Sequence, residues 1–198
     1  MRPTSSSHIS SIFSQGGRVA AALLLLSFAL TALPLLADDD SPEPRDYKFE
    51  DYRSPTPKTL EGATVVTVQQ AREIWLAGKT VFIDAMPRSP RPPDLPNDTL
   101  WRDKVRETIP GAVWLPNIGY GRLSPEVDAY FRRSLEELTG GDRTKPLLFF
   151  CMANCWMSWN AAKRAREEYG YTQITWFPQG TDGWAFPDAP LVKVEPRP

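Results

Sequence analysis

Continuous apolar runs alternate with amphipathic stretches along this chain, and that alternation constrains its fold more than any other feature. Residues 80–85 and 146–150 are apolar at nearly every position, which is typical of strands that are buried on both faces. A shorter run at 174–177 follows the same pattern. Strands that alternate with helices predict an α/β fold, in which helices flank a mostly parallel sheet through right-handed crossovers.

Three amphipathic helices are predicted between these strands. The first begins at a capping box of Thr67 and Gln70 and ends before Gly78. The second is predicted over about 124–139 and the third over about 156–169, and each ends before a glycine. These caps place the helix boundaries within the alternating pattern.

A long loop is predicted over residues 86–108, which contain five prolines. We expect one helical turn within it, around 98–105. The loop leads through an Ile-Pro-Gly-Ala turn at 109–112 into a brief strand that ends near Pro116. The length of the loop suggests a functional role.

The first 37 residues have the pattern of a secretory signal peptide. Arg18 precedes the apolar run Val19–Leu30, which is shorter than the roughly 20 residues of a membrane span. We therefore predict cleavage after Ala37, with an uncleaved anchor as the alternative. Residues 38–58 are acidic and proline-rich and are predicted to be a flexible linker before one domain over 59–198. Export predicts a periplasmic protein without a membrane span, in a compartment that permits disulfides.

Charge and residue usage exclude several classes of function. The 23 Lys and Arg residues balance 24 Asp and Glu residues, so no electrostatic field attracts nucleic acid or an anionic membrane. Histidine occurs once, at His8 within the predicted signal peptide, so the exported form would contain no imidazole. Two cysteines without histidine leave half of a tetrahedral zinc site empty, and a haem would lack its axial ligand.

Cys151 and Cys155 are the candidate catalytic residues. Cys151 directly follows the strand 146–150, and reactive groups of open α/β sheets gather at the carboxyl ends of strands. Free amides of the loop and of the next helical turn would favour a thiolate, so we expect a lowered pKa for Cys151. The simpler alternative is that both cysteines are small buried apolar residues.

The spacing of the two cysteines is one residue wider than in thioredoxin-like centres. In a regular helix their Cβ atoms would be about 6 Å apart, beyond the roughly 3.8 Å of a disulfide, so a bridge requires a non-helical loop. No cofactor is firmly predicted. A bound redox cofactor stays open, and so does a Cu(I) site formed by the two thiolates with Met152 or Met157.

Several other residues are assigned structural roles. Asp84 is expected to cap the turn that follows its strand. Trp156 and Trp159 are expected in the core, with an aromatic wall for a flat quinone as the alternative. The third helix has a basic face that is predicted to be solvated, formed by Lys163, Arg164 and Arg166.

The order of several short motifs resembles the rhodanese-like family. They are a strand that ends in an acid at 81–84, the turn at 109–112, the Phe-Phe-Cys strand end at 149–151, and Gly183-Trp184. The likeness extends over about residues 60–192. It implies a rhodanese-like fold and a cysteine that carries sulfur as a persulfide. By position, Cys151 would be the nucleophile, and the substrate would be held by Met152, Ala153, Asn154 and Trp156.

A narrower resemblance covers the segment from Cys151 to Arg164. It is similar to the exported cysteine-tryptophan motif proteins associated with catabolism that depends on pyrroloquinoline quinone (PQQ). This resemblance implies a supporting role in periplasmic alcohol oxidation. The implied partner is a quinoprotein dehydrogenase, or a protein that donates or accepts thiols.

The cysteine loop also departs from the sulfurtransferase pattern. It lacks the cationic residue that often receives thiosulfate, although Arg88 or Arg91 of the long loop could supply one. Cys155 adds a resolving thiol. Two hypotheses follow. In the first, Cys151 attacks and Cys155 resolves in a sulfurtransferase or thiol–disulfide oxidoreductase. In the second, a non-catalytic accessory module binds a redox cofactor or soft metal, or docks a dehydrogenase.

Overall fold

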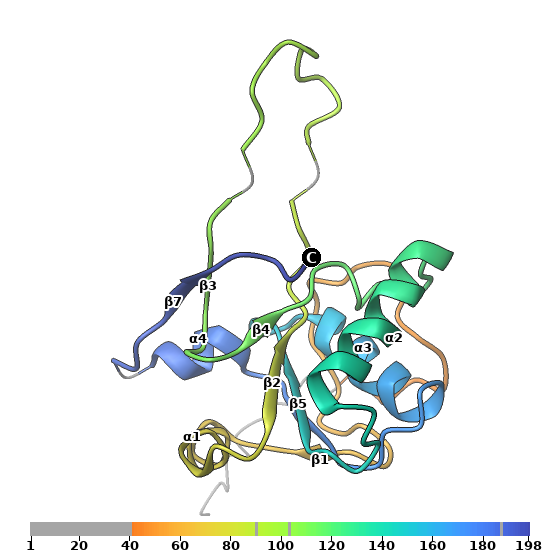
Figure 1. Ribbon diagram of the computed structural model, residues 1–198, viewed down its shortest axis with the longest axis vertical. Coiled ribbons are helices and arrows are strands. Elements are labelled where there is room, and N and C mark those ends of the chain that lie inside the picture. Colours follow the sequence, from red (N-terminus) through yellow and green to blue (C-terminus); the bar gives the residue numbers. More distant parts are fainter. Residues whose placement is uncertain (1–40, 90, 103, 187) are drawn as a thin grey trace, which may run out of the picture. The chain divides into compact units, whose positions relative to one another are not determined.

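The computed structural model describes residues 41–89, 91–102, 104–186 and 188–198, so the predicted signal peptide at 1–37 lies outside it. The central sheet has the strand order β1-β6-β5-β2-β4, and every neighbouring pair is parallel. Its strands are β1 (Thr64–Val65), β2 (Val81–Asp84), β4 (Val113–Trp114), β5 (Leu147–Phe150) and β6 (Ile174–Phe177). The predicted α/β fold class with a mostly parallel sheet is confirmed (Figure 1).

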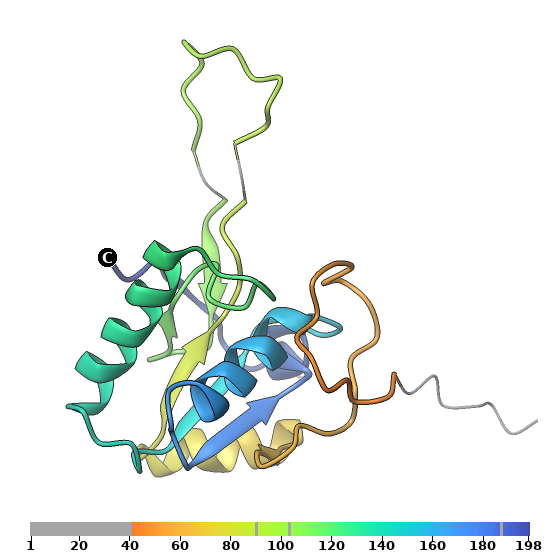
Figure 2. The same cartoon turned by 90° about the vertical axis from the view of Figure 1, so that its right-hand side faces the viewer.

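Helices cover both faces of this sheet (Figures 1 and 2). They are α1 (Val68–Ala77), α2 (Pro125–Thr139), α3 (Trp156–Glu167) and the short α4 (Gly180–Ala185). Alternate residues of β5 face opposite layers: Leu147 and Phe149 pack in the core with α2 and α3, whereas Leu148 and Phe150 pack with α1 and α4. β5 is therefore buried on both faces, as its continuous apolar run predicts. None of the helices in the described residues has the length and apolar composition of a membrane span.

The predicted helix caps are present. The Thr67 side chain accepts a hydrogen bond from the Gln70 backbone amide, and the Gln70 side-chain oxygen accepts one from the Thr67 backbone amide, which completes the capping box of α1. Gly78 and Gly140 end α1 and α2 in the left-handed conformation, at φ 65° and 66°. Ser124 caps α2 by accepting from the Val127 amide at 3.4 Å.

The long loop differs from its prediction in two ways. Its described residues contain no helical turn over 98–105; the nearest local bond is a single turn in which the Thr99 amide donates to the Pro96 carbonyl at 2.9 Å. The loop ends in a strand that the sequence analysis does not anticipate, β3 (Arg106–Thr108), which pairs antiparallel with β7 (Val192–Val194). This pairing anchors the return of the loop next to the carboxyl end of β2.

The described part of the predicted linker is packed on the domain. We call residues 47–58 the strap; it lies beside α3 (Figure 2). The Tyr47 hydroxyl donates to Glu168 at 2.6 Å, and the Asn160 side chain exchanges two hydrogen bonds with the Lys48 backbone at 2.8 and 2.9 Å. The prediction of a flexible linker rested on average composition. It overlooked the tyrosines, which supply packing that proline and charge do not.

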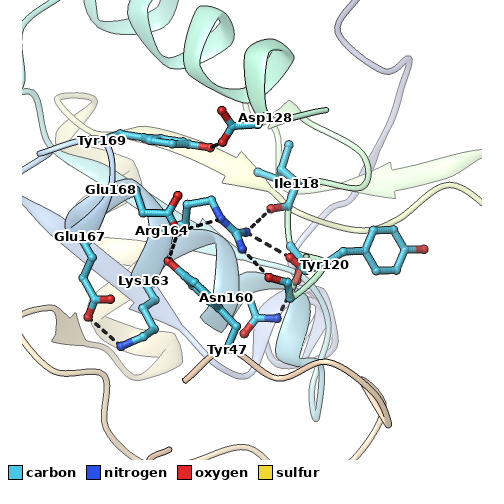
Figure 3. A network of polar contacts seen from close by, with 12 residues as sticks. Tyr47, Ile118, Tyr120, Asp128, Asn160, Lys163, Arg164, Glu167, Glu168 and Tyr169 are labelled. Atoms are coloured by element: carbon cyan, nitrogen blue, oxygen red, sulfur yellow. Dashed lines mark hydrogen bonds and ion pairs between the residues drawn. The ribbon is translucent and has the colours of Figure 1, made fainter. Parts of the chain in front are cut away.

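The basic residues of α3 lie in surroundings that differ from the predicted solvated face (Figure 3). Arg164 is buried, with 4% of its side chain exposed. Its guanidinium donates to the carbonyls of Ile118, Tyr120 and Gly121 at 3.3, 3.1 and 2.8 Å. Lys163 is also buried and pairs with Glu167 at 2.7 Å. The helix is covered on this side by the strap and by the loop before α2, so the prediction of a solvated face is wrong for Arg164 and Lys163.

Candidate active site

The candidate site lies at the carboxyl edge of the parallel sheet. Cys151 directly follows β5, and the loop from it reaches Cys155, the residue that caps α3. Asn154 has a left-handed backbone with φ 52°, and Cys155 is extended with φ −127°. The loop is therefore non-helical, which is the condition that the spacing sets for a Cys151–Cys155 bridge. Both cysteines are free thiols in this structure.

The carbonyl of Cys151 is held by three donors. It accepts from the amide and the hydroxyl of Thr181 at 3.1 and 3.2 Å, and from the guanidinium of Arg106 at 3.3 Å. The adjoining Gly180 forms a β-bridge with Met152. A Cβ built on Gly180 would lie 2.6 Å from the Cys151 carbonyl oxygen, so only glycine allows this close approach.

A buried carboxylate supports the same end of the loop. Asp84 accepts from Arg106 Nε at 2.7 Å, from the Thr108 hydroxyl at 2.6 Å and from the Met86 amide at 3.0 Å. The last contact is the turn cap expected of Asp84. Burial raises the pKa of this carboxyl against the opposing effect of Arg106. Asp84 positions Arg106, which in turn holds the Cys151 backbone.

Two amides of the cysteine segment are bonded away from the Cys151 sulfur. The Ala153 amide donates to the Asp182 carboxylate at 3.2 Å, and the Trp156 amide donates to the Tyr52 carbonyl at 3.0 Å. The strap supplies a further contact, because Arg53 donates to the Ala153 carbonyl at 2.9 Å. Acceptors other than the Cys151 sulfur therefore occupy these two donors.

The surroundings of Cys155 favour its ionised form instead, through the Cys151 thiol, the Met157 amide in the first turn of α3, and Arg53. The Cys151 thiol itself donates to the Met86 Sδ at 3.5 Å. The Cys151 thiol has the largest effect, and together these groups lower the pKa of Cys155 to about 7 despite its burial. Cys155 is the thiol that this environment ionises.

Cys151 has the opposite electrostatic environment. Cys151 is fully buried, and this burial raises the pKa of its thiol well above the ordinary value. The neighbouring Cys155 sulfur and the Asp84 carboxylate raise it further. The expectation of a lowered pKa at Cys151 is therefore wrong, because the helix terminus and the cation act at the other end of the loop.

The residues predicted to bind substrate lie in different surroundings. Asn154 is exposed, Met152 and Ala153 are half-buried, and Trp156 is 2% exposed. The Trp156 indole donates to the Ser54 hydroxyl at 3.0 Å and to the Pro55 carbonyl at 3.1 Å, so it anchors the strap. Trp159 is also in the core, as expected. Binding of substrate by these loop residues stays a prediction.

One hollow is lined in part by the cysteine loop, and a second lies beside Met86. The larger, about 570 Å³, is lined by Ala153 and Asn154 together with strap residues 55–58, residues 65–67 of the β1 edge, Pro178 and Gln179. The smaller, about 140 Å³, lies beside Met86 and is lined on its cationic side by Arg88, Lys104 and Arg106. Arg91 is instead bonded within its own loop, to the carbonyls of Leu95, Pro96 and Thr99. Of the two suggested cations, Arg88 is the one beside the site.

Sequence reasoning did not identify Arg53, Met86 or Arg106 as site residues. Met86 carries a usable signal, because it follows β2 by two residues and parallel neighbours end at one edge; its Sδ lies 3.5 Å from the Cys151 Sγ. Arg53 and Arg106 lie in segments assigned to a linker and a loop. Neither has a local pattern that predicts its contact with the cysteine loop.

Comparisons with known proteins yield distant structural similarity. No family model matches the chain, and no curated protein matches it. A thiosulfate sulfurtransferase from Pseudomonas aeruginosa is similar with a TM-score of 0.45 and 16% identity, over 68% of this chain and 21% of that chain. An uncharacterized protein from Saccharomyces cerevisiae is similar with a TM-score of 0.39 and 19% identity, over 63% and 92%.

The chain thus spans about a fifth of the length of the Pseudomonas protein. At these levels of similarity, the fold assignment rests on the topology described above rather than on either neighbour.

Proposed function

We propose that this protein performs thiol–disulfide exchange, with Cys155 as the attacking thiolate and Cys151 as the resolving thiol. The observation that carries the proposal is the position of Cys155: it lies at the N-cap of α3 next to the free Cys151 thiol, in surroundings that lower the pKa of Cys155. A partly ionised sulfur next to a second thiol is the arrangement that exchange requires. This assignment reverses the roles that the sequence analysis gives to the two cysteines.

The reaction is a two-electron exchange with a disulfide substrate. The Cys155 thiolate attacks one sulfur of the substrate disulfide, which forms a mixed disulfide and releases a substrate thiolate. Cys151 then loses its proton and attacks the Cys155 sulfur, which releases the second substrate thiolate and forms the Cys151–Cys155 disulfide. The substrate is reduced and the protein is oxidised. A dithiol protein that reverses these steps would restore the free thiols.

The cellular setting is part of the proposal. The N-terminal pattern supports export to the periplasm, where disulfide exchange is chemically permitted. The resemblance to the cysteine-tryptophan motif proteins supports a role beside PQQ-dependent alcohol oxidation, with a quinoprotein dehydrogenase or one of its thiol-bearing accessory proteins as the partner.

Trapping the intermediate tests the assignment of roles. Oxidised glutathione is added to the reduced Cys151→Ser and Cys155→Ser variants, and intact mass identifies any adduct. We expect a stable glutathione adduct on Cys155 in Cys151→Ser, and little adduct on Cys151 in Cys155→Ser. Adduct formation only on Cys151 would restore the original assignment, and the absence of any adduct would reject exchange.

Persulfide transfer is the second candidate. It is favoured by the small hollow beside Met86, whose lining by Arg88, Lys104 and Arg106 suits an anionic sulfur donor. Thiosulfate is added to the reduced protein, and intact mass is measured before and after cyanide treatment. One extra sulfur that cyanide removes would support this function over exchange.

A further inference from the structure

Sulfur atoms are concentrated in one buried cluster beside the loop. The cluster contains Cys151, Cys155 and Met157, with Met86 and Met152 packed against it. These are all the cysteines and methionines of the described residues. They come from the end of β2, the cysteine loop and the first turn of α3, so the fold gathers them from separate parts of the chain.

Met86 is the thioether whose contact with a cysteine is resolved. Its Sδ lies 3.5 Å from the Cys151 Sγ, and the turn cap from Asp84 to the Met86 amide at 3.0 Å fixes its backbone. Cys155 packs in the same buried cluster as Cys151. Two cysteine side chains and one thioether side chain are therefore neighbours in a site where both cysteines are buried and Met86 is partly buried.

The donor set selects one kind of metal. Within the described residues, no three His, Cys, Asp or Glu side chains are grouped as a metal site, so zinc and the hard divalent cations lack ligands. The nearby carboxylate of Asp84 is engaged by Arg106 and Thr108. Thiolates with a thioether are soft ligands, and soft ligands favour Cu(I).

We propose that Cys151, Cys155 and Met86 form a three-sulfur binding site for Cu(I). Binding releases the remaining thiol protons and changes no oxidation state. The complex of one Cu(I) with two thiolates carries a single negative charge, and the guanidinium groups of Arg53 and Arg106 lie beside the loop to balance it. The disulfide form has no thiolates, so copper binding and disulfide formation exclude each other.

Competition with a Cu(I) chelator tests the site. Reduced wild type, Met86→Leu and Met152→Leu are titrated without oxygen against bathocuproine disulfonate, and thiolate-to-copper absorption and X-ray absorption report the ligands. Leucine for methionine nearly conserves volume, so the variants are expected to fold. Met152→Leu is the matched control, because Met152 lies in the same cluster without a resolved contact to a cysteine sulfur.

We expect one Cu(I) per protein, and an affinity at least about tenfold lower in Met86→Leu than in wild type or Met152→Leu. X-ray absorption is expected to show three sulfur neighbours in wild type and a changed set in Met86→Leu. Equal affinity in wild type and Met86→Leu, or no competition with the chelator by the wild type, would overturn the proposal. Glutathione trapping in Cys151→Ser is carried out without copper, so failure of the copper site leaves the exchange reaction separately testable.

Discussion

Cys151 and Cys155 lie at opposite ends of one short loop, and the two ends differ in what their backbone and side chains are bonded to. At the β5 end, donors hold the carbonyl of Cys151 and leave its sulfur among apolar atoms and a carboxylate. At the α3 end, the Cys151 thiol, the Met157 amide and Arg53 lower the pKa of Cys155. A position after a strand and before a helix therefore does not by itself lower the pKa of a cysteine thiol. The pKa depends on the groups that surround the sulfur atom.

The largest expected effect is on reactivity toward a small alkylating agent. The pKa of Cys155 is lowered to about 7 and that of Cys151 is raised well above its ordinary value, so Cys155 is expected to be the more ionised thiol at pH 7. Cys155→Ser is therefore expected to lower the alkylation rate constant at least about 50-fold, and Cys151→Ser far less. Mass spectrometry of peptides during a time course measures both. Faster labelling of Cys151 than of Cys155 would contradict the conclusion that Cys155 is the more reactive thiol.

A second prediction concerns the close contact between Gly180 and the Cys151 carbonyl at the β5 end of the loop. Gly180→Ala places a Cβ 2.6 Å from the Cys151 carbonyl oxygen, whereas Gly170→Ala meets nothing within 4 Å. Both glycines have positive φ, at 49° and 76°, so both variants carry the backbone strain. Gly180→Ala is expected to lose about 2 kcal/mol more stability than the Gly170→Ala control in urea unfolding. Equal losses of stability in the two variants would mean that the space beside Gly180 can accommodate a Cβ.

A third prediction measures how much the Cys151 thiol contributes to the lowered pKa of Cys155. Cys151→Ala removes the donor with the largest effect on Cys155, so the pKa of Cys155 is expected to rise from about 7 toward the ordinary range. Reactivity at pH 7 then falls about tenfold. Cys151→Ser retains a donor and is expected to keep much of the lowered pKa. Thiolate absorbance measured against pH distinguishes the two variants. Identical curves would show that the donor at position 151 is not the cause of the lowered pKa of Cys155.

The smallest expected effect is at Arg53. Each of the two effects of its guanidinium on the pKa of Cys155 is smaller than the effect of the Cys151 thiol, so Arg53→Gln is expected to raise that pKa by less than Cys151→Ala does. The alkylation rate at pH 7 would fall about twofold to threefold. Arg45→Gln, a change outside the strap, serves as the control. A larger effect at Arg53 would show that the strap, rather than the α3 end, activates Cys155.

The sequence predicts the layers of this fold because local patterns encode them. The buried run 146–150, the capping box at Thr67 and the glycine at 140 all act over a few residues, and the structure has each of them. The candidate loop could be located for the same reason. The ionisation of its two cysteines could not, because it depends on Arg53 and on the direction of individual amides.

The same limit explains the errors outside the loop. Arg164 has the sequence neighbours of a solvated helix residue, but the carbonyls of residues 118–121 meet its guanidinium. The strap has the composition of a linker, but its tyrosines dock on α3. Both contacts join segments that are distant in the sequence, and helical or strand periodicity carries no information about such pairs.

The docking of the strap also joins distant parts of the chain. Its contacts with α3 and the C-cap of that helix join residues 101 to 121 positions apart. Closing loops of this length costs conformational entropy that contacts between sequence neighbours do not cost. The strap therefore belongs to the folded domain, and removing it would expose the side of α3 on which Trp156 and Asn160 hold it.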